Sequence, residues 1–169
     1  MTLEERVAEL ERRMTALERP RKADEHSEPT GEHKFWALKQ LTKDLQKREA
    51  TNGGVVYAGT ITLPTGEQYE WQQGALAEGL LETDWEQAAE PLAALGHQVR
   101  LRLLREILIG RSTVSALTEI KDVGTTGQIY HHLRQLTNAG WLRTAARGRY
   151  EVPAGRIVPL LVILSAAGL

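Results

Sequence analysis

Two adjacent histidines, His131 and His132, lie in the middle of the segment GTTGQIYHHLRQLTNAGWL, residues 124–142. Imidazole side chains serve as metal ligands and as general bases. Successive residues of a helix differ by about 100° around its axis, so these two rings cannot easily bind one metal ion, as rings four residues apart can. The chain also has no cysteine, no HExxH run and no phosphate-binding loop. We therefore expect no metal site, no cofactor and no enzymatic activity.

The same segment has the pattern of a helix with an apolar side and a polar side. Thr125 or Thr126 can cap its first turn, and Gly140 suits the left-handed position at its end. The apolar spacing predicts a buried stripe of Ile129, Leu133 and Leu136, with His132 and Thr137 at its border. The opposite side carries hydrogen-bonding groups suited to the major groove of DNA: Gln128, Tyr130, His131, Arg134 and Asn138.

The elements expected around this helix follow the order helix, helix, turn, helix and β-hairpin, which is typical of a winged helix-turn-helix domain. Residues 92–110 predict one helix, and residues 113–120 predict a short helix capped by Ser112 or Thr113. Residues 141–152 predict two short strands around Arg147 and Gly148. Residues 156–169 predict a helix that is apolar on nearly every side. We place this domain at residues 85–169.

Charge is sorted along the chain, and this favours a polyanionic partner for the predicted domain. Residues 97–151 hold nine basic and four acidic side chains, whereas residues 50–96 hold seven acidic and no basic ones. Phosphate neutralisation supplies affinity for DNA, and a few base-edge contacts supply specificity. The residues expected to contact DNA are Arg100, Thr125, Thr126, Gln128, Tyr130, His131, Arg134, Arg143, Arg147 and Arg149.

Roles can be assigned within this set. Arg134 can take a guanine edge and Gln128 an adenine edge. Arg100 is expected to contact a phosphate. The tip around Arg147 and Arg149 can reach a minor groove, where arginine is favoured.

These motifs resemble those of the ArsR family of winged-helix transcriptional regulators. The likeness covers residues 92–167 and is carried by His97, Arg100 and Leu104, then His132, Leu133, Leu136, Ala139 and Gly140, and then Arg149 and Tyr150. It implies that the polar side of the 125–140 helix faces DNA and that the C-terminal helix forms a dimer. The chain lacks the cysteine pairs of metal-sensing members, and its terminal helix has no ligand-type side chain. The resemblance therefore supports DNA binding and not metal sensing.

Two segments are expected to bring two copies together as a homodimer. Residues 1–18 have a heptad pattern, formed by Leu3, Val7, Leu10, Met14 and Leu17. The alternative is a single amphipathic helix packed on its own domain. The terminal helix must be covered by its own domain or by a second subunit, and we favour the subunit, through Val158, Leu161, Val162 and Leu164. Residues 19–33 read as a linker.

Residues 34–84 predict an acidic module that has no counterpart in a minimal ArsR protein. It comprises a helix from Phe35, a hairpin with its turn at Pro64, Thr65 and Gly66, and a helix running through Leu80, Leu81 and Trp85. Six residues are candidates for an effector or partner surface: Tyr57, Glu67, Tyr69, Glu70, Trp71 and Trp85. This surface can be a pocket for a cationic or amphipathic molecule, a contact for RNA polymerase or another protein, or a solvated acidic face.

The expected fold class is mainly α with small β (α+β), a winged helix-turn-helix preceded by a coiled-coil helix, a linker and a helix plus hairpin module. The expected function is a cytoplasmic, dimeric, sequence-specific regulator of transcription that binds an inverted repeat in double-stranded DNA and has no membrane span. The alternative is a protein-interaction module that reuses a winged helix without reading DNA sequence.

Overall fold

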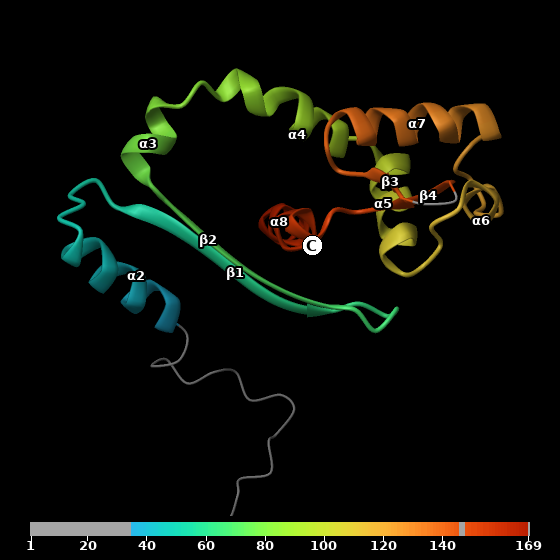
Figure 1. The fold of residues 1–169 in the computed structure, drawn as a ribbon. Helices are drawn as coiled ribbons and strands as arrows, with labels where there is room; N and C mark the ends of the chain where they lie inside the picture. The colour runs from blue at the N-terminus through green and yellow to red at the C-terminus, as the bar shows by residue number, and fades with distance from the viewer. Residues whose placement is uncertain (1–34, 146–147, 169) are drawn as a thin grey trace, which may run out of the picture. The chain divides into compact units, whose positions relative to one another are not determined.

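The structure is a computed structural model, and it describes residues 35–145 and 148–168 (Figure 1). The predicted heptad residues Leu3, Val7, Leu10, Met14 and Leu17 lie outside the described residues, as do the predicted linker at 19–33 and Arg147. The chain divides into two compact units, residues 1–40 and residues 41–169. The hydrophobic core lies within the second unit.

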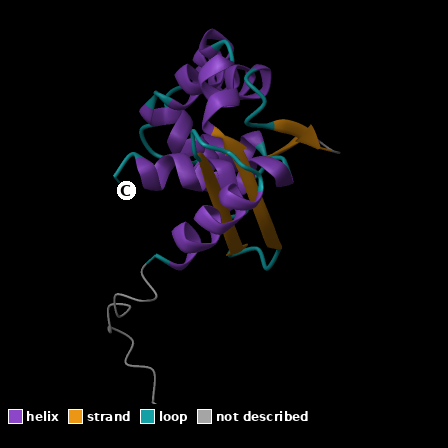
Figure 2. Cartoon of the chain, turned by 90° about the vertical axis from the view of Figure 1, so that its left-hand side faces the viewer, coloured by secondary structure: helices purple, strands orange, loops and turns teal. Residues whose placement is uncertain are grey.

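The described chain belongs to the α+β class, as expected (Figure 2). Its two sheets are separate, and each is an antiparallel pair of strands. The elements in order are α2 (Trp36–Lys47), β1 (Gly54–Thr62), β2 (Gln68–Leu76), α3 (Ala77–Glu82), the 3-10 helix η1 (Trp85–Ala88), α4 (Ala89–Leu95), α5 (Gln98–Leu108), α6 (Val114–Thr118), α7 (Thr126–Asn138), β3 (Arg143–Ala145), β4 (Arg149–Glu151) and α8 (Ala154–Ala166). Within the described residues, no helix is both long and apolar enough to cross a bilayer.

The hydrophobic core lies between α5, α6, α7 and α8. The predicted stripe of α7 is confirmed, because Ile129, Leu133 and Leu136 are all fully buried. Their neighbours in the core include Leu103 and Leu104 of α5, Leu117 of α6, Trp141, and Ile157 and Leu160 of α8. Burial of such side chains contributes about 1.5–3 kcal/mol each, so this stripe fixes which side of α7 faces solvent.

The predicted helix over residues 92–110 is wrong in one respect, because it is two helices. Helix α4 ends at Leu95, and α5 begins at Gln98. His97 between them has extended backbone angles, and its Nδ1 accepts a hydrogen bond from the Val99 N–H at 3.2 Å. Gly96 favours such an end because glycine loses the most entropy in a helix. The apolar spacing continues across the break and conceals it.

The predicted helix through Leu80, Leu81 and Trp85 is likewise interrupted. Helix α3 ends at Glu82, and η1 begins at Trp85. Asp84 caps η1, since its carboxylate accepts a hydrogen bond from the Glu86 N–H at 3.0 Å. A short polar side chain at this position favours the start of a new helix over continuation of the old one.

The long hairpin β1–β2 forms with the predicted turn. Leu63 and Glu67 close it through a backbone hydrogen bond of 2.9 Å, and Gly66 occupies the turn with a φ of +91°. The register pairs Gly59 with Trp71 and Ile61 with Tyr69, so these four residues share one face of the hairpin.

This face of the hairpin packs against α8 (Figure 1). A Cβ atom placed on Gly59 would lie 2.8 Å from Cγ1 of Val158, and one placed on Gly155 would lie 3.4 Å from the ring of Trp71. Val158 is buried within its own chain at 1% exposure. The prediction that Val158 serves a second subunit is therefore wrong, and the alternative, cover by the same chain, holds at this position.

Three other residues of α8 were expected at a dimer interface. Leu161 and Leu164 pack partly against the chain's own core, and Val162 is partly buried as well. These three side chains are only partly buried, so their role in dimerisation stays a prediction.

Candidate nucleic-acid interface

The N-terminus of α7 is held by a reciprocal capping box. Oγ1 of Thr125 accepts a hydrogen bond from the Gln128 N–H at 3.4 Å, and Oε1 of Gln128 accepts one from the Thr125 N–H at 2.8 Å. The predicted cap by Thr125 is confirmed. The same oxygen would be needed for a bidentate contact with adenine, so the cap competes with the predicted adenine contact of Gln128, which stays a prediction.

The exposed side of α7 carries the polar groups that the sequence pattern predicts there. Tyr130 is 48% exposed, and the other exposed members are Thr126, His131, Arg134 and Asn138. Among the described residues, the side chains of Tyr130 and Arg134 have no hydrogen-bond partner. Their donors are therefore available to a ligand, on a helix whose opposite side is fixed in the core.

The hairpin β3–β4 follows α7, as predicted, and is anchored to the start of α6. Tyr150 donates its backbone N–H to the Ser112 carbonyl at 2.7 Å, and Arg149 pairs with Thr113. Arg149 is exposed, as a DNA contact requires. Arg143 instead forms an ion pair with Glu151 on the opposite strand, so its charge is largely neutralised.

Arg100 does not have the role that the sequence suggested. Its Nε and one terminal nitrogen donate to the carbonyls of Ala94 and Ala93, and its other terminal nitrogen donates to Oε1 of Gln135 on α7 at 2.7 Å. These bonds satisfy the carbonyls at the end of α4 and join α4 and α5 to α7. The prediction of a phosphate contact is therefore replaced by a structural role.

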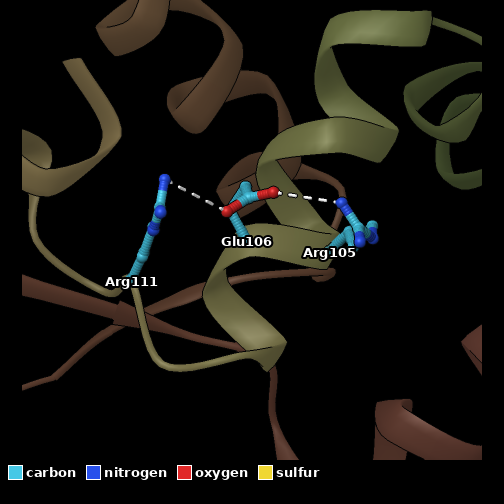
Figure 3. A network of polar contacts seen from close by, with 3 residues as sticks. All are labelled: Arg105, Glu106 and Arg111. Carbon is cyan, nitrogen blue, oxygen red and sulfur yellow. Dashed lines mark hydrogen bonds and ion pairs between the residues drawn. The ribbon is translucent and has the colours of Figure 1, made fainter. Parts of the chain in front are cut away.

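Glu106 of α5 is a buried carboxylate that sequence reasoning missed (Figure 3). It is 6% exposed and lies 3.2 Å from an Arg105 nitrogen and 3.5 Å from an Arg111 nitrogen. A single acidic residue within the apolar run LRLLREIL was the available signal. A buried carboxylate is retained only with such partners, so both arginines serve the fold.

These ion pairs and hydrogen bonds reduce the basic face inferred from the charge count. Of the basic residues between 97 and 151, four are engaged within the chain: Arg100, Arg105, Arg111 and Arg143. The four other described ones, for which no ion pair is found among the described residues, are Arg102, Lys121, Arg134 and Arg149. Among the described residues, Arg134 on α7 and Arg149 on β4 are thus the two predicted DNA-contacting arginines without an ion pair.

The paired histidines are separated by environment, as the helix geometry predicts. His131 is exposed, whereas His132 is partly buried, with its ring centroid 4.7 Å from that of His97. Burial, together with the nearby His97 and Arg100, lowers the pKa of His132 below 6.5. Its Nδ1 is buried without a hydrogen-bond partner among the described residues. Within residues 35–145 and 148–168, no group of three or more His, Cys, Asp or Glu side chains is suited to bind a metal ion.

The six residues of the candidate effector surface do not form one site. Glu67 and Tyr69 line a cavity of about 290 Å³ together with Arg143 and Arg149, so the module expected to lack cations receives two from β3–β4. Burial, and then the carboxylates of Glu67 and Glu151, raises the pKa of Tyr69 above 10.

The other four residues lie elsewhere. The Tyr57 hydroxyl donates to Gln73 at 2.7 Å on the hairpin itself. Glu70 directly precedes Trp71 on the strand and so lies on the opposite face. Trp71 packs against Gly155, and Trp85 borders a different cavity. The six residues therefore do not form one pocket, and the other two alternatives, a protein contact and a solvated acidic face, stay open.

Comparison with protein-family models, curated proteins and solved structures finds no significant match for this chain. The ArsR likeness therefore stays a prediction that rests on the quoted residues.

Proposed function

We propose that the chain is a sequence-specific DNA-binding regulator of transcription, in which α6, α7 and β3–β4 act as a winged helix-turn-helix. One observation carries the proposal. Helix α7 has a fully buried apolar side and, opposite it, exposed hydrogen-bonding groups that no other described residue engages, chief among them Tyr130 and Arg134. An amphipathic helix held in this way is the usual reader of the major groove.

In this proposal α7 lies in the major groove and β4 follows the backbone. The helix has 13 residues, which gives it a length of about 20 Å and lets it reach several base pairs. Arg134 donates to a guanine edge, and Tyr130 and His131 contact neighbouring edges or phosphates. Thr126, in the first turn, lies where backbone N–H groups favour a phosphate. Arg149 adds a phosphate contact.

Two copies are needed to read enough sequence for a site in a genome, so we propose a homodimer on an inverted repeat. Because Val158 is covered by the chain's own hairpin, the heptads of residues 1–18 become the main proposed means of dimerisation.

The salt dependence of DNA binding tests this proposal. Fluorescence anisotropy with a labelled mixed-sequence duplex should give an affinity that falls with salt, and Arg149→Ala should reduce the slope by about one counterion per protomer. Arg105→Ala is the matched control, because Arg105 is exposed but pairs with Glu106 on α5. Absence of duplex binding at low salt, or equal effects of the two variants, would favour the protein-interaction module.

A further inference from the structure

A second cavity, distinct from the candidate DNA-contacting face, is formed by α3, η1, α4 and α8. Its volume is about 600 Å³, which falls within the range of small-molecule sites, about 300–1,000 Å³. Its wall is mostly apolar and includes Leu80, Trp85, Leu92, Trp141, Pro159 and Ile163. Trp85 is 68% exposed and Leu92 is 52% exposed, so the chain itself leaves this apolar surface open to solvent.

The two indole rings of the cavity have no free donors. The ring N–H of Trp85 donates to the Leu80 carbonyl at 2.8 Å, and that of Trp141 donates to the Pro91 carbonyl at 2.8 Å. Trp85, at 68% exposure, therefore offers carbon surface to a ligand, whereas Trp141 is buried at 2% exposure, and polar recognition must come from another side chain.

Arg156 of α8 is the residue that can supply this recognition. It lines the cavity, and its guanidinium carbon lies 5.1 Å from the ring centroid of Trp141. Among the described residues its guanidinium has no hydrogen bond or ion pair, in contrast to those of Arg100, Arg105 and Arg143. The acidic residue in the wall, Asp84, caps η1 through Oδ1 and forms no ion pair with Arg156. An unpaired guanidinium thus stands beside an open apolar cavity.

We propose that this cavity binds a small amphipathic carboxylate. The apolar body of the ligand packs against Trp85 and Leu92, and the carboxylate accepts hydrogen bonds from Arg156. The planar guanidinium fork matches a carboxylate in both charge and geometry. A carboxylate can pair with the guanidinium of Arg156, whereas a cationic ligand would meet it with like charge. This site does not depend on DNA binding and can be tested without DNA.

The test uses two probes of equal chain length, octanoate and octylammonium, titrated into the full chain while tryptophan fluorescence and binding heat are followed. Octanoate should give a saturable change, and octylammonium should bind at least about tenfold more weakly. Arg156→Gln should weaken octanoate binding about tenfold and remove the discrimination between the probes. Arg105→Gln, an exposed arginine outside the cavity, should change neither.

A second variant addresses the apolar part of the site. Ala88 is an exposed residue of the cavity wall, so Ala88→Leu fills part of the cavity without disturbing the core. It should weaken octanoate binding while the circular dichroism spectrum and the unfolding midpoint stay unchanged. The proposal is overturned if octanoate gives no saturable change, if both probes bind equally to the unmodified chain, or if Arg156→Gln binds octanoate as tightly as the parent.

Discussion

The contact between Gly59 on β1 and Val158 on α8 gives the sharpest test of how the terminal helix is covered. A Cβ atom on Gly59 would lie 2.8 Å from Cγ1 of Val158, a distance that a buried side chain at 1% exposure cannot relieve without moving. We therefore expect Gly59→Ala to separate the hairpin from α8. If a second subunit covered Val158 instead, this substitution would meet no such obstacle.

The change in the free energy of unfolding caused by Gly59→Ala is the difference between two opposed effects. Overpacking of this kind costs about 1–3 kcal/mol, and replacing glycine with alanine returns about 0.4–1 kcal/mol by restricting the unfolded chain. The net loss of stability is therefore at most about 2.5 kcal/mol, with a central value of about 1 kcal/mol. Val158→Ala alone removes two methyl groups and should cost about 2 kcal/mol. In the double variant the new methyl group occupies the vacated space, so the combined loss should fall short of the sum by at least about 1 kcal/mol.

Urea unfolding of the four chains, followed by circular dichroism, measures this coupling. Gly74→Ala is the matched control, because its added Cβ lies 3.4 Å from the Val55 carbonyl oxygen, an ordinary contact on the same hairpin. It should change the free energy of unfolding by less than about 0.5 kcal/mol. Additive losses from Gly59→Ala and Val158→Ala, within about 0.5 kcal/mol, would refute the packing of the hairpin on α8.

Further predictions concern the polar contacts that position α7. Arg100→Met should cost about 2 kcal/mol in urea unfolding, because it breaks charge-assisted bonds to Ala93, Ala94 and Gln135; an unchanged stability would contradict its structural role. Removing Arg105 and Arg111 together should cost about 3 kcal/mol, since it leaves Glu106 buried without a cation, whereas Arg105→Ala alone should cost less than about 1 kcal/mol. Because the pKa of His132 is lowered from 6.5, the unfolded chain takes up a proton before the folded chain as the pH falls, and stability present above pH 6.5 is lost below it. His132→Gln should remove that part of the stability difference between about pH 7.5 and about pH 5.5; equal pH dependence in both chains would contradict the assignment.

Local features could be predicted from the sequence because their causes are local. The stripe of Ile129, Leu133 and Leu136 and the left-handed Gly140 depend on spacing and backbone angles within one helix. The turn at Gly66 is local in the same way. The capping box was also readable, since Thr125 and Gln128 have the T-x-x-Q spacing of that motif. Assigning Gln128 to adenine ignored this competing local bond.

Features that depend on distant segments could not be predicted. The sequence of an all-apolar helix such as α8 indicates only that the helix must be covered. The contact between Gly59 and Val158 forms only when the hairpin packs against α8. The role of Arg100 depends on where α4 ends relative to α7, which periodicity does not specify. The division of the aromatic residues between two cavities has the same origin, because Tyr69 and Trp85 meet different elements in the folded chain.

The central claim is that the exposed side of α7 reads DNA sequence, and selection from a random duplex pool tests it most directly. The full chain should enrich one motif, arranged as an inverted repeat, and Arg134→Ala should lose that enrichment while keeping the parent's stability, because Arg134 is exposed. The binding free energy of Arg134→Ala for the enriched site should be weaker by about 1–3 kcal/mol for each guanine that Arg134 reads. Enrichment of no motif, or of the same motif with the same affinity by Arg134→Ala, would contradict the account.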